Sequence, residues 1–278
     1  MTEDPFPQPG SKPIMHKFSL TRIAGLYLHY LYSVRRNPAR IIEILVWPGI
    51  EVVLFAVLAS SQHGKAPDSA GITLSILTGI VFWNCTARII QETTAQLTDD
   101  FTSKNIQSLL ITPIRLSELL IGITAASISK IILSLSALAI ILNLIHPTFF
   151  DTFGPHVFLW VFQLELVGVA LSYISIAAVC IFGERVGFIG WMISTVLQIF
   201  SLVFYERAAL PPVLNLLSYA VPSSYIFEAI RSYIPGALLF SQPQVLALLL
   251  SVGYAALGIF FVSVAFRLAK HLGTFAKI

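Results

Sequence analysis

Three ionisable side chains lie near the middle of long apolar runs, where a charge is expensive. These are Glu51, Lys130 and Glu165. At the centre of a bilayer a charge costs about 2.5–3.5 kcal/mol on insertion scales, so all three should face the interior of a helix bundle and not lipid. Ser127 and Ser134 share a helix face with Lys130, because the three are spaced i, i+3 and i+7.

Two interpretations fit this polar set. In the first, the side chains form a polar strip along a path for a substrate. In the second, Lys130 pairs with Glu51 or Glu165 and holds helices together, as ionisable groups inside membranes commonly do. We favour the ion pair.

The other chemistry-bearing residues form no catalytic or metal-binding pattern. The 6 histidines lie mainly between the apolar runs or at their edges. H-E-x-x-H, G-x-S-x-G and Cys/His clusters are absent from the sequence. The ATP-binding pattern G-x-x-x-x-G-K-[S/T] is absent too, because Gly64-Lys65 is followed by Ala66. The sequence therefore predicts a protein that is not itself an enzyme and holds no metal or cofactor.

The elements that must position these residues are transmembrane helices. Of the 278 residues 56% are hydrophobic and only 11% are charged, with a mean hydropathy of +0.82, whereas a soluble domain carries about 25% charged residues. A bilayer core about 30 Å thick needs roughly 20 apolar residues in a helix. We predict an all-α membrane protein with six spans, near residues 41–60, 72–91, 119–144, 157–182, 187–205 and 244–266.

The basic residues predict the orientation of these spans. With both ends inside, 13 Lys and Arg residues lie on the inner side and 3 on the outer side, a strong positive-inside bias. Because the basic residues stand between apolar runs, they report topology and not a nucleic-acid partner. Residues 1–19 are predicted to be a disordered cytoplasmic segment, and residues 271–278 a cytoplasmic tail.

Three segments outside the spans carry their own patterns. Residues 20–36 have apolar side chains at helical spacing, which predicts a helix lying in the cytoplasmic interface with its tyrosines at headgroup depth. The long loop at 92–118 contains a short amphipathic piece at Asn105–Ile111, which suits docking to a soluble partner. Residues 211–234 are apolar but interrupted by prolines, which predicts a pair of short re-entrant helices on the outer side.

Together these features resemble the permease subunit of type-2 ABC exporters. The resemblance covers residues 20–270 and rests on the following stretches: Arg35-Arg36-Asn37-Pro38 before Trp47-Pro48; Ser108-Leu109-Leu110-Ile111-Thr112-Pro113-Ile114-Arg115 followed by Ser117-Glu118-Leu119-Leu120; and Pro211, Tyr219, Pro222, Tyr225, Glu228, Ala229 and Arg231. The Arg-Asn-Pro stretch looks more like the drug- and lipid-type exporters than the polysaccharide type.

The resemblance implies partners and sites. A second permease copy, in a homodimer, would complete a pathway through the bacterial inner membrane, and two cytoplasmic ATPase subunits would bind ATP and Mg. The implied ATPase-coupling residues are Asn105, Ile106, Leu109, Leu110, Ile111 and Arg115, with Glu184 and Arg185 as a second contact. The implied outer gate comprises Pro222, Tyr225, Glu228 and Arg231, and the last two, close to one helical turn apart, could pair with each other.

Alternative functions remain open at this point. Export of lipid-linked polysaccharide would use the same architecture. A membrane scaffold or sensor that transports nothing would purify without an ATPase subunit. An intramembrane enzyme lacks the residues it would need. The low charge of the spans favours export of a hydrophobic or amphipathic substrate, with both termini cytoplasmic.

Overall fold

A computed structural model describes residues 18–35, 38–61, 69–145, 147, 149–233 and 242–272. Within these residues the chain is helical and contains no strand. The helices are α1 Leu20–Arg35, α2 Pro38–Ser60, α3 Ser69–Thr102, α4 Asn105–Ile111, α5 Leu116–Ile145, α6 Phe149–Phe153, α7 His156–Phe182, η1 Gly183–Val186, α8 Ile189–Phe200, η2 Arg207–Ala209, α9 Pro212–Ser218, α10 Pro222–Arg231 and α11 Gln242–Leu272.

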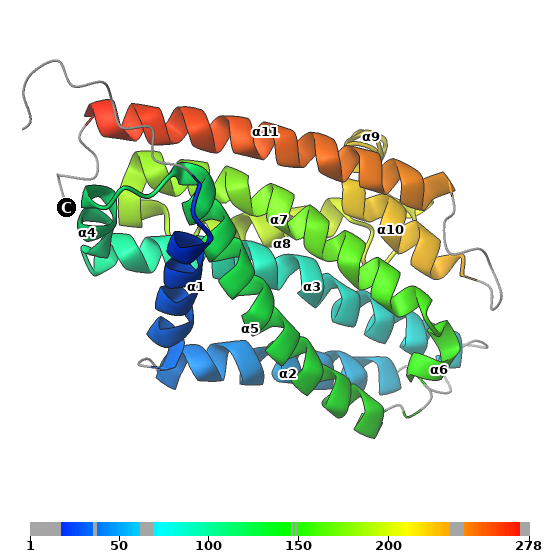
Figure 1. The fold of residues 1–278 in the computed structure, drawn as a ribbon. Coiled ribbons are helices and arrows are strands. Elements are labelled where there is room, and N and C mark those ends of the chain that lie inside the picture. Colours follow the sequence, from blue (N-terminus) through cyan, green and yellow to red (C-terminus); the bar gives the residue numbers. More distant parts are fainter. Residues whose placement is uncertain are drawn as a thin grey trace, which may run out of the picture.

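Five of the described helices, α2, α3, α5, α7 and α11, are long and apolar enough to cross a membrane. They run along the length of the molecule, with α4 at one end and α6 at the other (Figure 1). We call these the α4 end and the α6 end. The all-α membrane fold predicted from the sequence is confirmed.

The fifth predicted span, residues 187–205, is shorter than expected. α8 has 12 residues, which at 1.5 Å per residue gives about 18 Å, too short for a core about 30 Å thick. The run stays apolar to Tyr205, but the backbone leaves the helix after Phe200 and Leu202 adopts φ 59°. Hydropathy cannot detect this turn, because it involves no change in composition.

The proline-rich segment after α8 forms two short helices, as its pattern predicts. α9 and α10 begin with Pro212 and Pro222, and the two helices are bent by 96°. Proline suits the first position of a helix, where its missing N–H has no partner to lose. If this bent pair is taken as one span, the described helices offer up to 6 spans.

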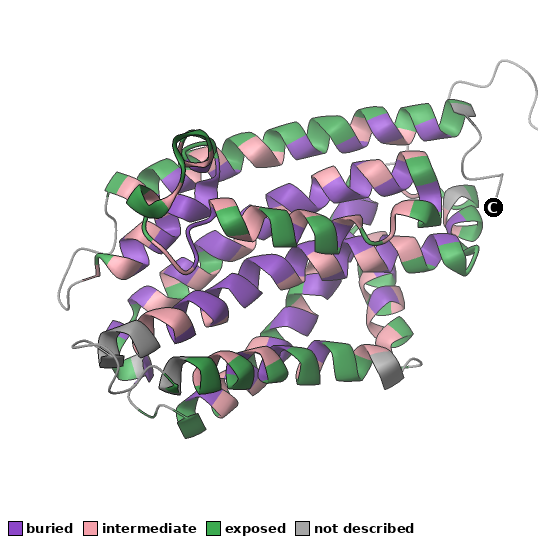
Figure 2. Cartoon of the chain, turned by 180° about the vertical axis from the view of Figure 1, so that it is seen from behind, coloured by how far each residue is buried: buried purple, intermediate pink, exposed green. Residues whose placement is uncertain are grey.

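The helix α7 lies at the centre of the bundle. An added Cβ at Gly168 would lie 1.8 Å from the Ile89 side chain of α3, and one at Gly258 would lie 2.8 Å from the Ala170 carbonyl of α7. Glycine thus allows α7 to approach α3 on one side and α11 on the other. Figure 2 shows the buried residues gathered along these central helices, whereas α2 is largely exposed.

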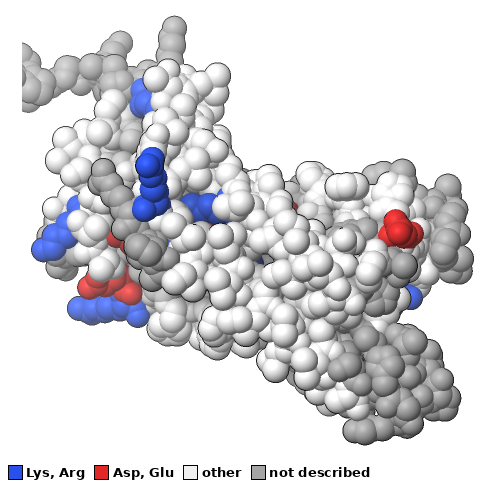
Figure 3. Space-filling view, turned by 90° about the horizontal axis from the view of Figure 1, so that it is seen from below, with Lys and Arg blue, Asp and Glu red and all other residues white. Residues whose placement is uncertain are grey.

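Two clusters of buried hydrophobic residues fill the bundle. The cluster at the α4 end includes Leu26, Leu97, Phe101 and Ile106. The cluster toward the α6 end includes an aromatic group of Phe82, Phe149, Phe153 and Trp160. The surface outside is mostly apolar, and charged side chains gather toward the α4 end in the view of Figure 3.

Candidate functional site: a polar groove, a coupling surface and a lid

At the α4 end, the carboxylate of Glu118 holds α1 against α5. Arg22 donates from Nε to Glu118 Oε2 at 2.9 Å and from Nη2 to Oε1 at 2.7 Å. The backbone N–H groups of Ser19 and Arg115 donate to the same carboxylate at 2.8 and 2.9 Å. Glu118 stands in the first turn of α5, where a negative charge is favoured by the helix dipole. A bidentate arginine fixes the angle between the two helices.

A second carboxylate, Asp100, fixes α1 to the end of α3. Tyr30 donates its hydroxyl to Asp100 Oδ2 at 2.6 Å, and His29 Nε2 lies 3.1 Å from Oδ1. The hydrogen bond to Asp100 raises the pKa of His29, and burial together with the same carboxylate raises the pKa of Tyr30 well above 10.0. α1 covers residues 20–35 of the helix predicted over residues 20–36, and residue 36 lies outside the described residues. Tyr30, however, is buried against protein and not placed among headgroups.

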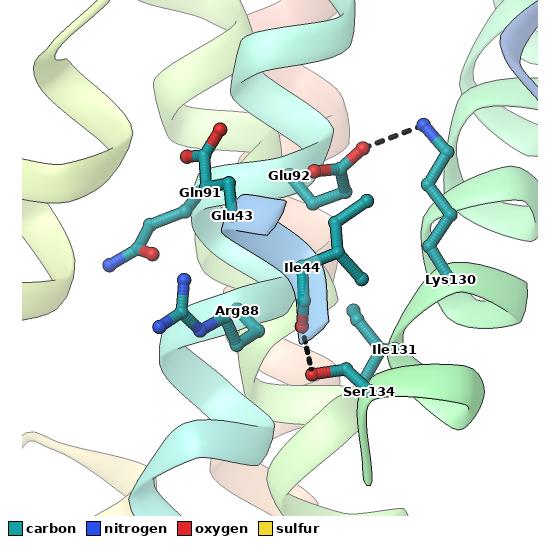
Figure 4. A pocket seen from close by; sticks show the side chains of 8 residues that line it. All are labelled: Glu43, Ile44, Arg88, Gln91, Glu92, Lys130, Ile131 and Ser134. Atoms are coloured by element: carbon teal, nitrogen blue, oxygen red, sulfur yellow. Dashed lines mark hydrogen bonds and ion pairs between the residues drawn. The ribbon is translucent and has the colours of Figure 1, made fainter. Parts of the chain in front are cut away.

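The predicted ion pair of Lys130 exists, but its predicted partners are wrong. Lys130 Nζ donates to Glu92 Oε1 at 2.6 Å (Figure 4). Glu92 was predicted to lie in a loop, whereas α3 continues without a break to Thr102. Residues 92–102 contain no proline or glycine to end the helix. Glu92 therefore lies on a buried face opposite α5.

The serines that share a face with Lys130 hold the same helix interface. Thr93 and Gln96 of α3 donate to Ser127 Oγ at 3.1 and 2.6 Å. Ser134 donates to the Ile44 carbonyl of α2 at 2.7 Å. The helix face deduced from the spacing is therefore buried, and its polar groups join α5 to α2 and α3.

Glu51 pairs with Arg88, a residue of α3. Arg88 Nη2 lies 3.5 Å from Glu51 Oε1, and Arg88 Nε donates to Asn84 Oδ1 at 3.4 Å. The pair stands in a cavity of about 250 Å³ between α2, α3 and α8. We call this cavity the groove. Its other polar lining residues are Asn84, Gln91, Ser194, Thr195 and Gln198. The aromatic residues Phe55, Trp83, Trp191 and Phe204 line it as well.

Glu165 is different from the other two ionisable residues. Both of its carboxylate oxygens are buried, and neither has a hydrogen-bond partner among the described residues. It stands on α7 and is not among the residues that line the groove. The structure therefore does not bring Glu165 together with Lys130 or Glu51.

Most of the predicted coupling residues are exposed at the α4 end. The short amphipathic helix was predicted at Asn105–Ile111, and α4 has these bounds. Ile106 is buried against the cluster there, whereas Ile111 is 87% exposed. Arg115 is exposed, and so are Asn105, Glu184 and Arg185. Leu109 is partly buried, and the side chain of Leu110 lies outside the described residues. Both α4 and η1 pack on the C-terminal part of α3.

At the α6 end, the predicted pairing within the outer segment is wrong. Glu228 binds Arg207 and not Arg231: Arg207 Nε donates to Glu228 Oε1 at 2.8 Å and Nη2 donates to Oε2 at 3.0 Å. Arg207 also donates to Ser218 and Ser224, and its guanidinium lies 4.0 Å from the centre of the Tyr219 ring. This network joins η2, α9 and α10 into a lid. Residue 234, at the end of the predicted segment, lies outside the described residues.

The other predicted gate residues, Pro222, Tyr225 and Arg231, all lie on α10. Pro222 is the first residue of α10 and is buried. Tyr225 donates its hydroxyl to the Tyr219 carbonyl at 2.9 Å. Arg231 donates from Nη1 to the Leu202 carbonyl. That carbonyl belongs to the turn that ends α8, which explains why sequence spacing alone could not find it.

The model of one protein family, described as ABC-2 type transporter, matches residues 30–234. The matched segment is well over half of the chain and includes α2 to α10. The chain belongs to the ABC-2 type transporter family. No curated protein matches it. The permease resemblance seen in the sequence is therefore confirmed at the level of the family.

As a member of the ABC-2 type transporters, the chain is the transmembrane component of a transporter and an integral membrane protein. Such a permease is generally not catalytic itself, and its family implies association with an ATPase subunit. No group of three or more metal-binding side chains occurs among the described residues. The charged residues whose partners sequence reasoning missed are Arg22, Arg88, Glu92, Asp100, Glu118 and Arg207. Arg22, Asp100 and Glu118 lie near helix ends, whereas Arg88 and Glu92 lie within α3.

Proposed function

We propose that this permease is the membrane subunit of an ATP-driven exporter of hydrophobic or amphipathic molecules. One observation carries the proposal: the groove between α2, α3 and α8 combines the Glu51–Arg88 pair with four aromatic side chains. Lipid tails cannot solvate a charged pair, so this groove must face protein or water. A second copy of the chain placed over the groove would enclose a pathway with polar and aromatic walls.

The exposed surface of α4 and η1 supports the coupling role. An ATPase subunit bound there would press on α4 and so on the end of α3, against which α4 packs. α1 would follow, because Asp100 ties it to α3 and Glu118 ties it to α5. One ATPase subunit for each permease copy would bind ATP and Mg. Closure of the two ATPase subunits on ATP would move the permease helices and open the pathway to the outer side.

The orientation follows from the charges. The α4 end carries most of the basic residues in the inner set, so we assign it to the cytoplasm of a bacterial cell. Both termini then lie inside. The lid of η2, α9 and α10 dips into the outer leaflet as a re-entrant pair and must move for substrate release.

The choice of cargo rests on the walls of the groove. Polar or charged side chains and apolar side chains line it in nearly equal numbers, which suits an amphiphile. Export of lipid-linked polysaccharide is the second candidate within this class. A scaffold or sensor without transport is the candidate of another class, and co-purification with an ATPase subunit distinguishes it.

The test is reconstitution of the permease with its ATPase subunit in liposomes. We expect ATP-dependent movement of a fluorescent amphiphile, and we expect Glu51→Gln to reduce it while the complex stays assembled. Leu249→Ala on the exposed face of α11 serves as the control, because Leu249 lines none of the cavities described here. ATPase activity without amphiphile movement, or a permease that never binds an ATPase, would overturn the proposal.

The coupling surface has its own test. Ile111→Asp and Arg115→Gln should weaken binding of the ATPase subunit and uncouple its ATP hydrolysis from transport. His271→Gln is the matched control, since His271 is also exposed and stands at the last turn of α11. Equal effects of all three changes would show that α4 has no special part in the contact.

A further inference from the structure

A second cavity lies inside a single chain at the α6 end. Its volume is about 230 Å³, and it lies between α3, α6 and α10. Its lining residues are Leu74, Ser75, Thr78, Gly79, Thr152, Phe153, Val203, Phe227, Ile230, Arg231 and Tyr233. Thr152 is exposed, and Leu74, Ser75 and Tyr233 are half-buried, so the cavity opens on this side. Its inner wall of Phe153, Phe227 and Ile230 is buried.

Arg231 is the only charged residue among those that line this cavity. Its Nη1 donates to the Leu202 carbonyl, but its Nη2 is covered from solvent and has no acceptor among the described residues. It also forms no ion pair within the described part of the chain. A buried charged donor without an acceptor is costly, and an unseen anion or water is the usual reason that one persists.

The neighbouring arginine shows the contrast. Arg207 has a carboxylate and two serine hydroxyls as acceptors and stands over an aromatic ring. Glu228 makes both of its short contacts with Arg207. Glu206 and Glu228 line another cavity together with Arg231, but neither forms an ion pair with it among the described residues. Arg231 follows Glu228 by less than one helical turn on α10. Its Nη2 has no acceptor among the described residues, and its side chain lines the largely apolar cavity.

We propose that this cavity binds the anionic headgroup of an amphiphile. A phosphate or carboxylate would accept from Arg231, the hydroxyls of Ser75 and Thr78 stand on the same lining, and the first carbons of the apolar chain would pack on Phe153, Phe227 and Ile230. The volume is below the roughly 300–1,000 Å³ of a drug-sized pocket, so it suits a headgroup and its adjoining carbons and not a whole lipid.

The apolar wall is preformed. Phe153 packs edge-on against Trp160 at 5.6 Å and against Phe82 at 6.4 Å, and Tyr233 packs edge-on against Trp160 at 5.4 Å. These ring contacts hold two lining residues in place before any ligand arrives. The site goes beyond the proposed function and does not depend on it, because it lies within one chain and needs neither the groove nor an ATPase.

The experiment measures binding to the full-length protein in a neutral detergent, by native mass spectrometry and by the shift of the thermal unfolding midpoint. The probes are dioctanoyl phosphatidic acid, dioctanoylglycerol with the same chains and no charge, and inorganic phosphate. We expect the phosphatidic acid to bind at one site per chain and to raise the midpoint, because a ligand of the folded state stabilises it. The other two probes should bind at least tenfold more weakly.

Two variants test the site. Arg231→Gln should weaken phosphatidic acid binding at least tenfold, which corresponds to about 1.4 kcal/mol. Because this change also removes the bond to the Leu202 carbonyl, Ser75→Phe provides an independent test that fills the cavity and leaves Arg231 in place. Arg267→Gln on α11 is the control, since it removes the same charge from an exposed position.

Each outcome decides. Loss of binding in Arg231→Gln and Ser75→Phe, with normal binding in Arg267→Gln, supports the site. Equal weakening by Arg267→Gln would show a general attraction of the anion to a basic protein. Equal binding of dioctanoylglycerol would show an apolar cavity without headgroup recognition, and equal binding of inorganic phosphate would identify a soluble anion. Each of these three results would overturn the proposal.

Discussion

The two ends of the bundle are held together by different chemistry. At the α4 end, charged and polar pairs connect helices: Arg22 with Glu118, Tyr30 with Asp100, and Lys130 with Glu92. At the α6 end, aromatic rings fill the core, and one arginine, Arg207, holds the lid. Directional bonds fix the angle at which helices cross, whereas edge-to-face rings fill the space between helices at the other end. This difference suits the proposed role of the α4 end in passing on a movement from an ATPase subunit.

The largest effect is expected from the buried pair at the α4 side. Lys130→Met leaves Glu92 as an uncompensated buried charge, and breaking such a pair costs about 3–5 kcal/mol. The free energy of unfolding in detergent should fall accordingly. The double change Lys130→Met with Glu92→Met should recover most of the loss. If the double variant is as unstable as the single one, charge pairing is not what holds α3 to α5.

The next effect is expected at the lid. Arg207→Gln removes the charge-assisted hydrogen bonds to Glu228. A hydrogen bond to a charged group contributes about 1.5–3 kcal/mol to stability. We expect faster amide exchange confined to α9 and α10, measured by hydrogen–deuterium exchange. Exchange in α1 should stay unchanged. Faster amide exchange in α1 as well would mean that the stability of the α4 end depends on the lid at the α6 end.

A smaller effect is expected from the aromatic core. Phe149 packs edge-on against Phe153 with ring centres 5.4 Å apart, and such pairs contribute about 0.5–1.5 kcal/mol. Phe149→Leu should lower the free energy of unfolding by about that amount. Phe158→Leu is the matched control, because Phe158 is 79% exposed. Equal losses in the two variants would argue against ring packing as the source.

The smallest effect concerns pH. The bond to Asp100 raises the pKa of His29 above 6.5 in the folded protein, so the proton on His29 stabilises the fold. This stabilisation is fully present below pH 6.5 and is lost as the pH rises through the raised pKa. His29→Gln should therefore lower the unfolding midpoint in mild acid and change it little in mild alkali. A larger effect of His29→Gln in mild alkali than in mild acid would show that protonation of His29 does not stabilise this contact.

The sequence predicted what depends on composition and local periodicity. The long helices, α1 and α4 were all visible as apolar runs or apolar faces, and α4 was placed with its observed bounds. Partners were harder to predict. Glu92 seemed to stand in a loop because polar residues follow span two, yet nothing there breaks a helix. Arg207 lies 21 residues from Glu228, and only folding of the intervening chain brings the two together.

The helix α3 is long enough to connect the two ends of the bundle. With 34 residues it is about 51 Å long and reaches from the α4 end to the anion cavity beside α6. It approaches α7 closely at Ile89, beyond its midpoint, where Gly168 leaves no room for a methyl group. It also packs against α2, α5 and α8, so it is supported on several sides. α3 would therefore resist bending, and a load on α4 would be shared with the neighbouring helices before it reached the far cavity.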